Sequence, residues 1–155
     1  MNTGESIAEL LFRIGNNNMK ESEMLNAWLW EKHREDIQWR RVRLGVLPTK
    51  ELARMYMTIL RWADAIFIKN GMVYIVEAGL RAGPGKIGQL ELYKQLFPNT
   101  LEFTQYKNWP IQLLVLTDYM DLNMAELCSK KDIIYEVFDL DQVNKTRISQ
   151  LLPIL

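Results

Sequence analysis

The chain has 155 residues, of which 48% are hydrophobic and 25% are charged, and its 19 basic residues balance its 19 acidic ones. This length and composition are typical of a single globular domain over residues 1–155, and zero net charge argues against tight, non-specific binding of nucleic acid. No apolar run approaches the roughly 20 residues of a membrane span, the N-terminus lacks a signal-peptide pattern, and a single cysteine, Cys128, excludes an internal disulfide. We therefore expect a cytoplasmic protein that does not contact a membrane.

Apolar spacing in the first half of the chain predicts two helices, a strand, a short helix and a hairpin. Neither face of the strand over 37–44 is cleanly apolar, which suits an edge strand or one that lines a charged cleft. The pair Asn70-Gly71 predicts a tight turn, because both residue types tolerate a positive φ. The expected helices span 5–14, about 20–32 and about 48–57, and the expected strands span 37–44, 63–68 and 72–77.

Strands and helices alternate in the second half of the chain. A Gly83-Pro84-Gly85 bend leads into its first helix. The expected helices span about 86–97, 118–130 (with Leu122, Ala125 and Leu127 inward) and 141–152, and the expected strands span 111–117 and 133–138. This order of elements predicts an α/β sandwich with a central mixed sheet flanked by helices.

The basic residues are concentrated in one segment. Residues 32–61 hold eight Lys and Arg residues against three acidic ones. Such a segment can contact a phosphate backbone, and it can equally be a solvated basic surface. Trp39 and Trp62 adjoin arginines and are candidates for stacking on nucleic acid, whereas His33 is expected to be solvated at a charged helix end. The candidates for phosphate contacts are Arg40, Arg41, Arg43, Arg61 and Arg81.

Two acidic residues interrupt the apolar strands of the hairpin. Asp64 lies in the first strand and Glu77 in the second. A carboxylate in an apolar strand is unfavourable to bury unless it is paired, hydrogen-bonded or bound to a metal. Two carboxylates on neighbouring strands can share a hard cation such as Mg²⁺, and phosphodiester hydrolysis is the chemistry that such a pair usually supports.

The helix after the hairpin carries polar residues at helical spacing. Gln89 and Tyr93 are four residues apart, and Lys86 precedes Gln89 by three, so all three are expected on one helix face. Near the N-terminus, Glu21 shares the inward edge of an apolar stripe, whereas Glu23 is turned away from it.

Together these residues resemble the PD-(D/E)XK, or restriction-endonuclease-like, nuclease superfamily. The element order over about 20–138 is also similar to the core of that family. The matching motifs are Trp62-Ala63-Asp64, Ile75-Val76-Glu77-Ala78-Gly79 and Gln89-Leu90-Glu91-Leu92-Tyr93.

The resemblance implies a nuclease that acts on DNA with Mg²⁺ or Mn²⁺. Its catalytic and metal-binding roles would fall on Asp64 and Glu77, with an acid of the first helix supporting the metal. That acid would be Glu21 rather than Glu23, and Gln89 and Tyr93 would position the substrate or structure the site.

One position departs from the family pattern, because Gly79 stands where the family has a lysine. Arg81 is expected on the same side of the strand and can stabilise phosphate charge, but it cannot act as a base. Lys86, at the start of the next helix, is the better replacement, since the family is known to place this lysine on other elements.

Three functions remain open. The first is a metal-dependent nuclease with Asp64, Glu77 and Lys86 in its site. The second is a nuclease fold that has lost catalysis and serves as a binding or assembly module, which the glycine at position 79 favours. The third is a subunit of a nucleoprotein machine in phage or mobile-element DNA processing. A homodimer is compatible with each of them.

Overall fold

The computed structural model describes residues 21–56 and 60–139. The helices expected over 5–14 and 141–152 lie outside these residues. In chain order the described elements are α2 (Glu21–His33), β1 (Ile37–Leu44), α3 (Lys50–Tyr56), β2 (Arg61–Lys69), β3 (Met72–Gly79), α4 (Gly85–Leu96), the 3₁₀ helices η1 (Phe97–Asn99) and η2 (Leu101–Tyr106), β4 (Ile111–Thr117), α5 (Leu122–Lys130) and β5 (Ile134–Val137).

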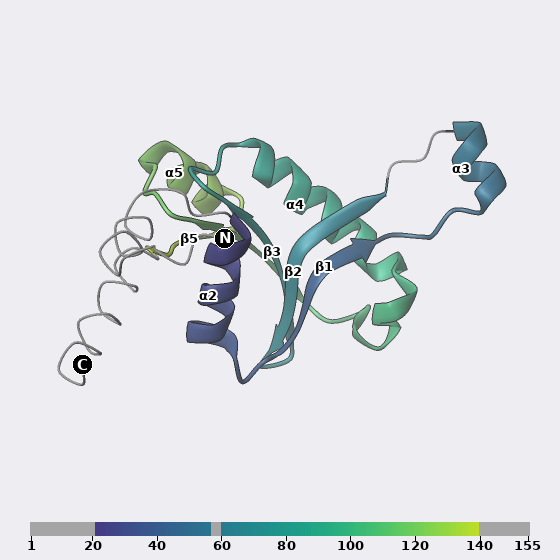
Figure 1. Ribbon diagram of the computed structural model, residues 1–155, viewed down its shortest axis with the longest axis horizontal. Helices are drawn as coiled ribbons and strands as arrows, with labels where there is room; N and C mark the ends of the chain where they lie inside the picture. Colours follow the sequence, from purple (N-terminus) through teal and green to yellow (C-terminus); the bar gives the residue numbers. More distant parts are fainter. Residues whose placement is uncertain (1–20, 57–59, 140–155) are drawn as a thin grey trace, which may run out of the picture.

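The five strands form one mixed sheet in the order β1-β2-β3-β4-β5 (Figure 1). β2 is antiparallel to β1 and to β3, whereas β4 is parallel to β3 and to β5. Parallel neighbours need a crossover connection, and α4 and α5 lie in the two crossovers. The predicted architecture, an α/β fold with a mixed sheet flanked by helices, is therefore confirmed.

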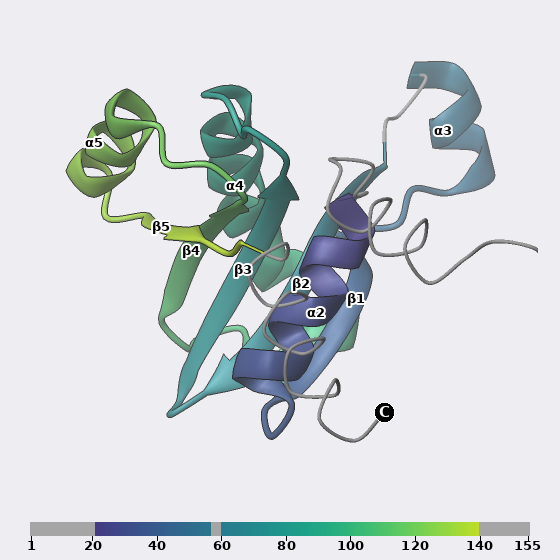
Figure 2. The same ribbon diagram turned by 60° about the vertical axis from the view of Figure 1, so that its left-hand side comes forward.

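Helices cover both faces of the sheet, so its central strands are buried on both sides (Figure 2). On one face, α2 packs Trp28 and Leu29 into a core that includes Phe67 of β2. On the other face, α4 and α5 contribute Leu90 and Cys128 to a second core. The nearly continuous burial of β3 follows from this arrangement and agrees with its apolar sequence.

The turn between β2 and β3 has the conformation that its sequence predicts. Asn70 and Gly71 have φ angles of 52° and 74°, and Lys69 pairs with Met72 across them. Two consecutive positive φ angles match the right-handed twist of the flanking strands. The expected hairpin is therefore confirmed, and its turn sets the register of the whole β2–β3 pair.

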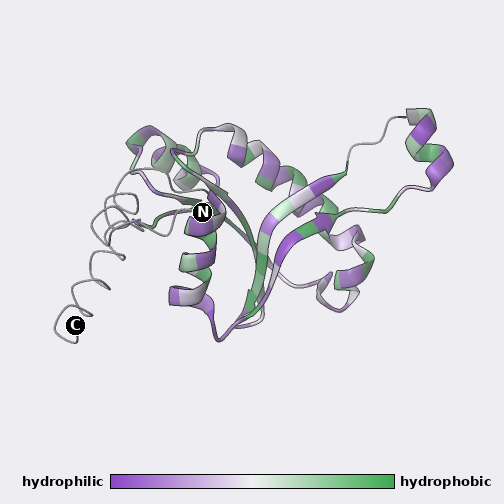
Figure 3. Ribbon diagram, viewed as in Figure 1, coloured by the Kyte–Doolittle hydropathy of each residue, from purple (hydrophilic) through white to green (hydrophobic). Residues whose placement is uncertain are grey.

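Helix α3 projects away from the sheet at the ends of β1 and β2 (Figure 1). Its Leu52 and Met55 are exposed, as are Val46 and Leu47 before it and Leu60 after it. The centre of the sheet is hydrophobic, whereas β1 and the start of β2 carry hydrophilic segments (Figure 3). The polar end of the β1–β2 pair thus lies on the side of the molecule from which α3 projects.

Helix α5 begins four residues later than predicted, at Leu122 instead of residue 118. The Asp121 side chain caps it, because Oδ1 accepts hydrogen bonds from the N–H groups of Asn123 (3.0 Å) and Met124 (3.2 Å). At the first helical position, Leu122 is 76% exposed, so its predicted inward orientation is wrong. The buried face of the helix is instead formed by Met124 and Cys128.

His33 is not the solvated residue that its charged neighbours suggest. Its ring stacks on Phe67, with centroids 4.0 Å apart, and contacts Trp28 edge-on at 4.5 Å. Its Nδ1 lies 2.9 Å from Oδ2 of Asp36. Because α2 ends directly over the sheet, its last side chain packs inward, a feature that depends on tertiary structure.

Candidate active site

The two predicted acids meet at the end of the β2–β3 hairpin away from the turn. The backbone ladder between these strands ends with Ala65 opposite Val76. Directly beyond it, the Asp64 N–H donates to Oε1 of Glu77 at 3.3 Å, and the Ala78 N–H donates to Oδ2 of Asp64 at 2.8 Å. At this end each strand therefore donates a backbone N–H to a carboxylate of the other strand.

Glu77 is the more buried of the two acids, with 3% of its surface exposed. The pKa of its carboxyl group is raised to about 7, chiefly by burial and next by the neighbouring Asp64 carboxylate, while the Lys86 ammonium opposes both effects. Two neighbouring carboxylates, one of them buried, repel each other, so a positive charge beside them stabilises the site. The protein supplies one such charge.

The Lys86 ammonium, in the first turn of α4, supplies a positive charge beside Glu77. Its Nζ lies 3.3 Å from Oε2 of Glu77, and its side chain is largely buried. A Cβ placed on Gly79 would lie only 2.9 Å from Cε of Lys86. The lysine side chain thus occupies the space that a side chain at position 79 would take, which explains why a residue without one stands there.

Tyr93 and Gln89 differ in orientation, although the spacing predicts one helix face for both. Tyr93 is 5% exposed, and burial together with the charges of Glu77 and Asp64 raises its pKa to about 12. Gln89 is exposed. Lys86 and Tyr93 are seven residues apart, nearly two full turns, so they align more closely than either does with Gln89. The structure therefore brings together Asp64, Glu77, Lys86 and Tyr93, with Gln89 outside this group.

A cavity of about 480 Å³ adjoins Asp64. It lies between the start of α2 and the strands β1 and β2, which run side by side in both views (Figures 1 and 2). Its charged and aromatic lining residues are Glu21, Arg40, Arg41, Trp62 and Asp64. The helix acid expected near the site thus lines the same cavity as Asp64, whereas Glu23 is not among the lining residues.

The donor groups around Asp64 and Glu77 are oxygens, the ligands that Mg²⁺ and Mn²⁺ prefer. Within residues 21–56 and 60–139, no three His, Cys, Asp or Glu side chains are close enough to hold one ion. Glu21 consequently does not join Asp64 and Glu77 in a three-acid set. The pair alone fits Mg²⁺, which usually keeps several water ligands and binds through one or two carboxylates.

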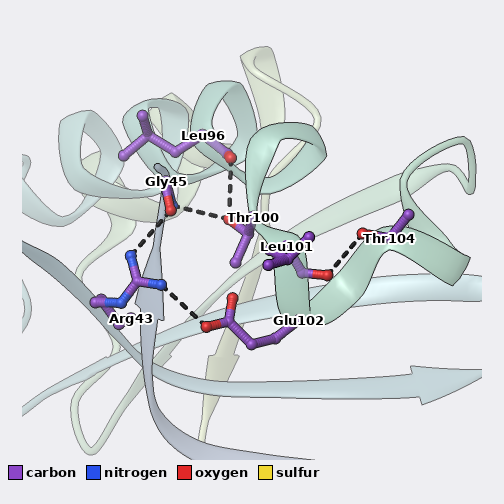
Figure 4. Close-up of polar contacts among 7 residues, drawn as sticks. All are labelled: Arg43, Gly45, Leu96, Thr100, Leu101, Glu102 and Thr104. Carbon is purple, nitrogen blue, oxygen red and sulfur yellow. Dashed lines mark hydrogen bonds and ion pairs between the residues drawn. The ribbon is translucent and has the colours of Figure 1, made fainter. Parts of the chain in front are cut away.

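The five candidate arginines do not form a single surface. Arg40 and Arg41 line the cavity beside Asp64, and Arg61 is exposed at the start of β2. Arg43 donates to the carbonyl oxygen of Gly45 (2.9 Å) and pairs with Glu102 at 3.0 Å (Figure 4). Its charge is therefore already used within the protein.

Arg81 does not occupy the place expected for it. β3 ends at Gly79, and Arg81 follows in a turn with a φ of 49°. Its guanidinium lies over the ring of Tyr119, 5.6 Å from the centroid. Since strand alternation stops at Gly79, the expectation that Arg81 shares the side of Glu77 is wrong. Lys86 is the basic residue that reaches Glu77.

Only one of the two candidate tryptophans is available for stacking. Trp39 packs against Phe103 and Tyr106, with ring centroids 5.0 and 6.0 Å away, and is partly buried against the core. Trp62 is 44% exposed and lines the cavity. Sequence alone treats both as neighbours of arginines and does not distinguish them.

Two solved structures resemble this one. A repair endonuclease from Pyrococcus abyssi aligns with a TM-score of 0.50 and 15% identity over 78% of this chain and 47% of its own. A protein of unknown function, AF1548, aligns with a TM-score of 0.50 and 11% identity over 79% of this chain and 64% of its own. This chain thus spans about half the length of the first and under two thirds of the second.

At these identities the similarity concerns the fold. A comparison with protein-family models finds no match, and a comparison with curated proteins finds none either. The five-stranded mixed sheet flanked by helices resembles the fold of a repair endonuclease, consistent with the predicted restriction-endonuclease-like architecture. No helix among the described residues has the length and apolar character needed to cross a membrane.

Proposed function

We propose that this protein is a metal-dependent nuclease that hydrolyses phosphodiester bonds in DNA. The observation that carries the proposal is the position of Lys86, whose side chain passes over Gly79 and places its ammonium 3.3 Å from Glu77. The charge that the family motif draws from the strand is thereby supplied from α4. The resemblance of the fold to a repair endonuclease supports the same choice.

Asp64 and Glu77 would hold the Mg²⁺ or Mn²⁺ ion. When bound, the ion would supply positive charge for the phosphate and lower the pKa of a water molecule. Asp64 is fixed by the N–H of Ala78 through Oδ2, and its side chain also lines the cavity. Glu77 is held by the Asp64 N–H through one oxygen and by Lys86 through the other.

Lys86 and Tyr93 would prepare the site for a charged substrate. The ammonium offsets part of the repulsion between the two carboxylates, and it can stabilise negative charge on a phosphate. Tyr93 stays protonated at neutral pH because its pKa is about 12, so it acts only as a neutral hydrogen-bonding group. Gln89, at the exposed edge of α4, would contact the substrate from outside this group.

Cleavage of labelled DNA tests the proposal directly. The full chain, incubated with linear, nicked and branched DNA, should cut at least one of them with Mg²⁺ or Mn²⁺ and none in EDTA. Asp64→Asn and Glu77→Gln should each lower the rate by about 100-fold or more, because each replaces a negatively charged metal ligand with a neutral amide. The matched control is Glu91→Gln, an exposed acid of α4 that pairs with Lys131 at 3.4 Å.

Absence of cleavage on every substrate, together with absence of Mn²⁺ binding by calorimetry, would contradict the nuclease proposal. The fold would then serve as a binding or assembly module. Homodimerisation, or entry into a larger nucleoprotein complex, is a separate prediction. Analytical ultracentrifugation of the full chain with and without DNA measures both.

A further inference from the structure

Arg41 has an unusual backbone conformation in the middle of a strand. Its φ is 50°, in the left-handed region that residues with a side chain rarely adopt. The flanking pairs are Arg40 with Ala65 and Val42 with Ala63, which places Arg41 opposite Asp64 in the register of β1 and β2. Strained residues of this kind cluster at functional sites, and this one lies directly beside the candidate active site.

The conformation of Arg41 changes which side chains share a face of the sheet. Trp39 and Val42 contribute to the same core, on the α4 side, although regular alternation would put them on opposite faces. Arg40 and Arg41, which regular alternation would also separate, both line the cavity beside Asp64. The strained residue thus brings two consecutive guanidinium groups to one cavity.

Trp62 adds an aromatic surface to these two charges. Its ring lies 5.7 Å from the guanidinium carbon of Arg41 and is 44% exposed. Glu21 and Asp64 also line the cavity, so phosphate groups within it would be drawn toward the arginines. A volume of about 480 Å³ lies within the range of small-ligand sites, roughly 300–1,000 Å³.

We propose that this cavity binds an unpaired nucleotide of single-stranded DNA next to the scissile phosphate. The base stacks on Trp62, and Arg40 and Arg41 hold the flanking phosphates. Aromatic rings bind single strands because unstacked bases expose their π-faces, whereas the bases of a duplex stack on each other. The choice of DNA as ligand rests on the proposed nuclease function, but binding in this cavity requires no catalysis.

Binding measured in EDTA separates this proposal from cleavage. Fluorescence anisotropy of the full chain with a labelled oligothymidine and with a hairpin duplex of equal nucleotide number should show tighter binding of the single strand. Trp62→Ala and Arg41→Ala should each weaken single-strand binding by about 10-fold. Trp30→Ala is the matched control and should leave binding unchanged. Trp30 is 60% exposed and also has an arginine, Arg34, over its ring at 5.4 Å, but it lies outside the cavity lining.

Arg41→Gly distinguishes a binding role from a structural one. Glycine adopts a φ of 50° without strain, so this variant should unfold at a higher temperature than Arg41→Ala. Both variants should nevertheless bind the single strand equally weakly, because both lack the guanidinium. Affinity that instead follows thermal stability would overturn the assignment of Arg41.

Two further results would overturn the proposal: equal affinity for single strand and duplex, or an equal loss of affinity in Trp62→Ala and Trp30→Ala. A protein that binds single strands through Trp62 but cuts no DNA with any metal would refute the nuclease function and leave this cavity assignment standing. Metal-dependent cleavage of DNA by a protein whose binding does not depend on Trp62 would refute the cavity assignment and leave the nuclease function standing.

Discussion

The two ends of the β2–β3 hairpin are built on different principles. At the turn, Lys69 pairs with Met72, and the backbone forms the ladder through Asn70 and Gly71. At the open end, the Asp64 and Glu77 side chains accept hydrogen bonds from backbone N–H groups of the opposite strand. Backbone pairing through a tight turn holds the first end together, whereas hydrogen bonds to carboxylates hold the second.

The difference shows where the fold accepts unfavourable features. The turn places a glycine where φ is positive and buries no charge. The open end buries Glu77 beside a second carboxylate, keeps Arg41 in a strained conformation and packs Lys86 tightly over Gly79. Features of this kind lower stability and are typical of functional sites. Changes at the open end should therefore alter activity, and changes at the turn should alter stability alone.

The largest expected effect comes from Lys86. Lys86→Ala should lower the cleavage rate by about 100-fold or more, because it removes the ammonium beside Glu77. Adding Gly79→Lys to this variant should restore at least about a tenth of the lost rate, since a lysine at position 79 would extend into the vacated space on the side of Glu77. Cleavage of a labelled substrate under single-turnover conditions measures both.

Lys94→Ala serves as the control for this swap, because Lys94 is an exposed lysine in the last turn of the same helix. An unchanged rate in Lys86→Ala would contradict the role given to Lys86. A double variant no faster than Lys86→Ala would show that the ammonium must come from α4 and not from the strand.

A smaller effect, on stability, is expected from Glu77→Gln in metal-free protein. The pKa of Glu77 is about 7 in the folded protein, whereas the ordinary value for a glutamate is 4.5. The folded protein therefore binds a proton on Glu77 more tightly than the unfolded chain does. Wild-type stability should therefore fall as pH rises from about 4.5 to about 7, relative to the glutamine variant.

At pH 8 the variant should be more stable than the wild type, by an amount on the order of 2 kcal/mol. At pH 5 the difference should be small. Urea denaturation in EDTA at both pH values measures the difference, and saturating Mn²⁺ should reduce it by stabilising the wild type. A difference independent of pH would argue against the burial of a charged Glu77.

The smallest expected effect contrasts the two glycines. Gly71→Ala should lower the free energy of unfolding by about 1 kcal/mol, because alanine is strained at a φ of 74°, and should leave cleavage unchanged. Gly79→Ala should instead lower the cleavage rate and change the free energy of unfolding little. Its Cβ would displace the end of the flexible Lys86 side chain. Equal effects of both variants on cleavage would remove the distinction between the two ends.

The order of strands and helices could be predicted because its signals are local. Alternation, apolar runs and the Asn-Gly turn located all five strands of the sheet to within a few residues. The start of α5 was missed, because the capping side chain of Asp121 determines it and three helix-compatible residues, 118–120, precede the cap. The placement of His33 was missed because it depends on the sheet below α2.

The candidate site was only partly visible in the sequence. The pairing of Asp64 with Glu77 followed from the hairpin register, and Lys86 followed from its position at the start of α4. Three features could not be predicted from the sequence: the exposure of Gln89, the turn at Arg81 and the separation of Glu21 from the acid pair. Each of these depends on the exact angle at which a helix or turn leaves the sheet.

By itself, the sequence determined the sheet, its hairpin and the approach of two carboxylates, because strand period and turn chemistry act over a few residues. Tertiary structure alone decided how closely Lys86 packs on Gly79, that Arg41 turns beside Asp64 and that Trp62 faces a cavity while Trp39 packs against the core. These features arise where elements distant in sequence pack together, and packing depends on the shapes of both partners.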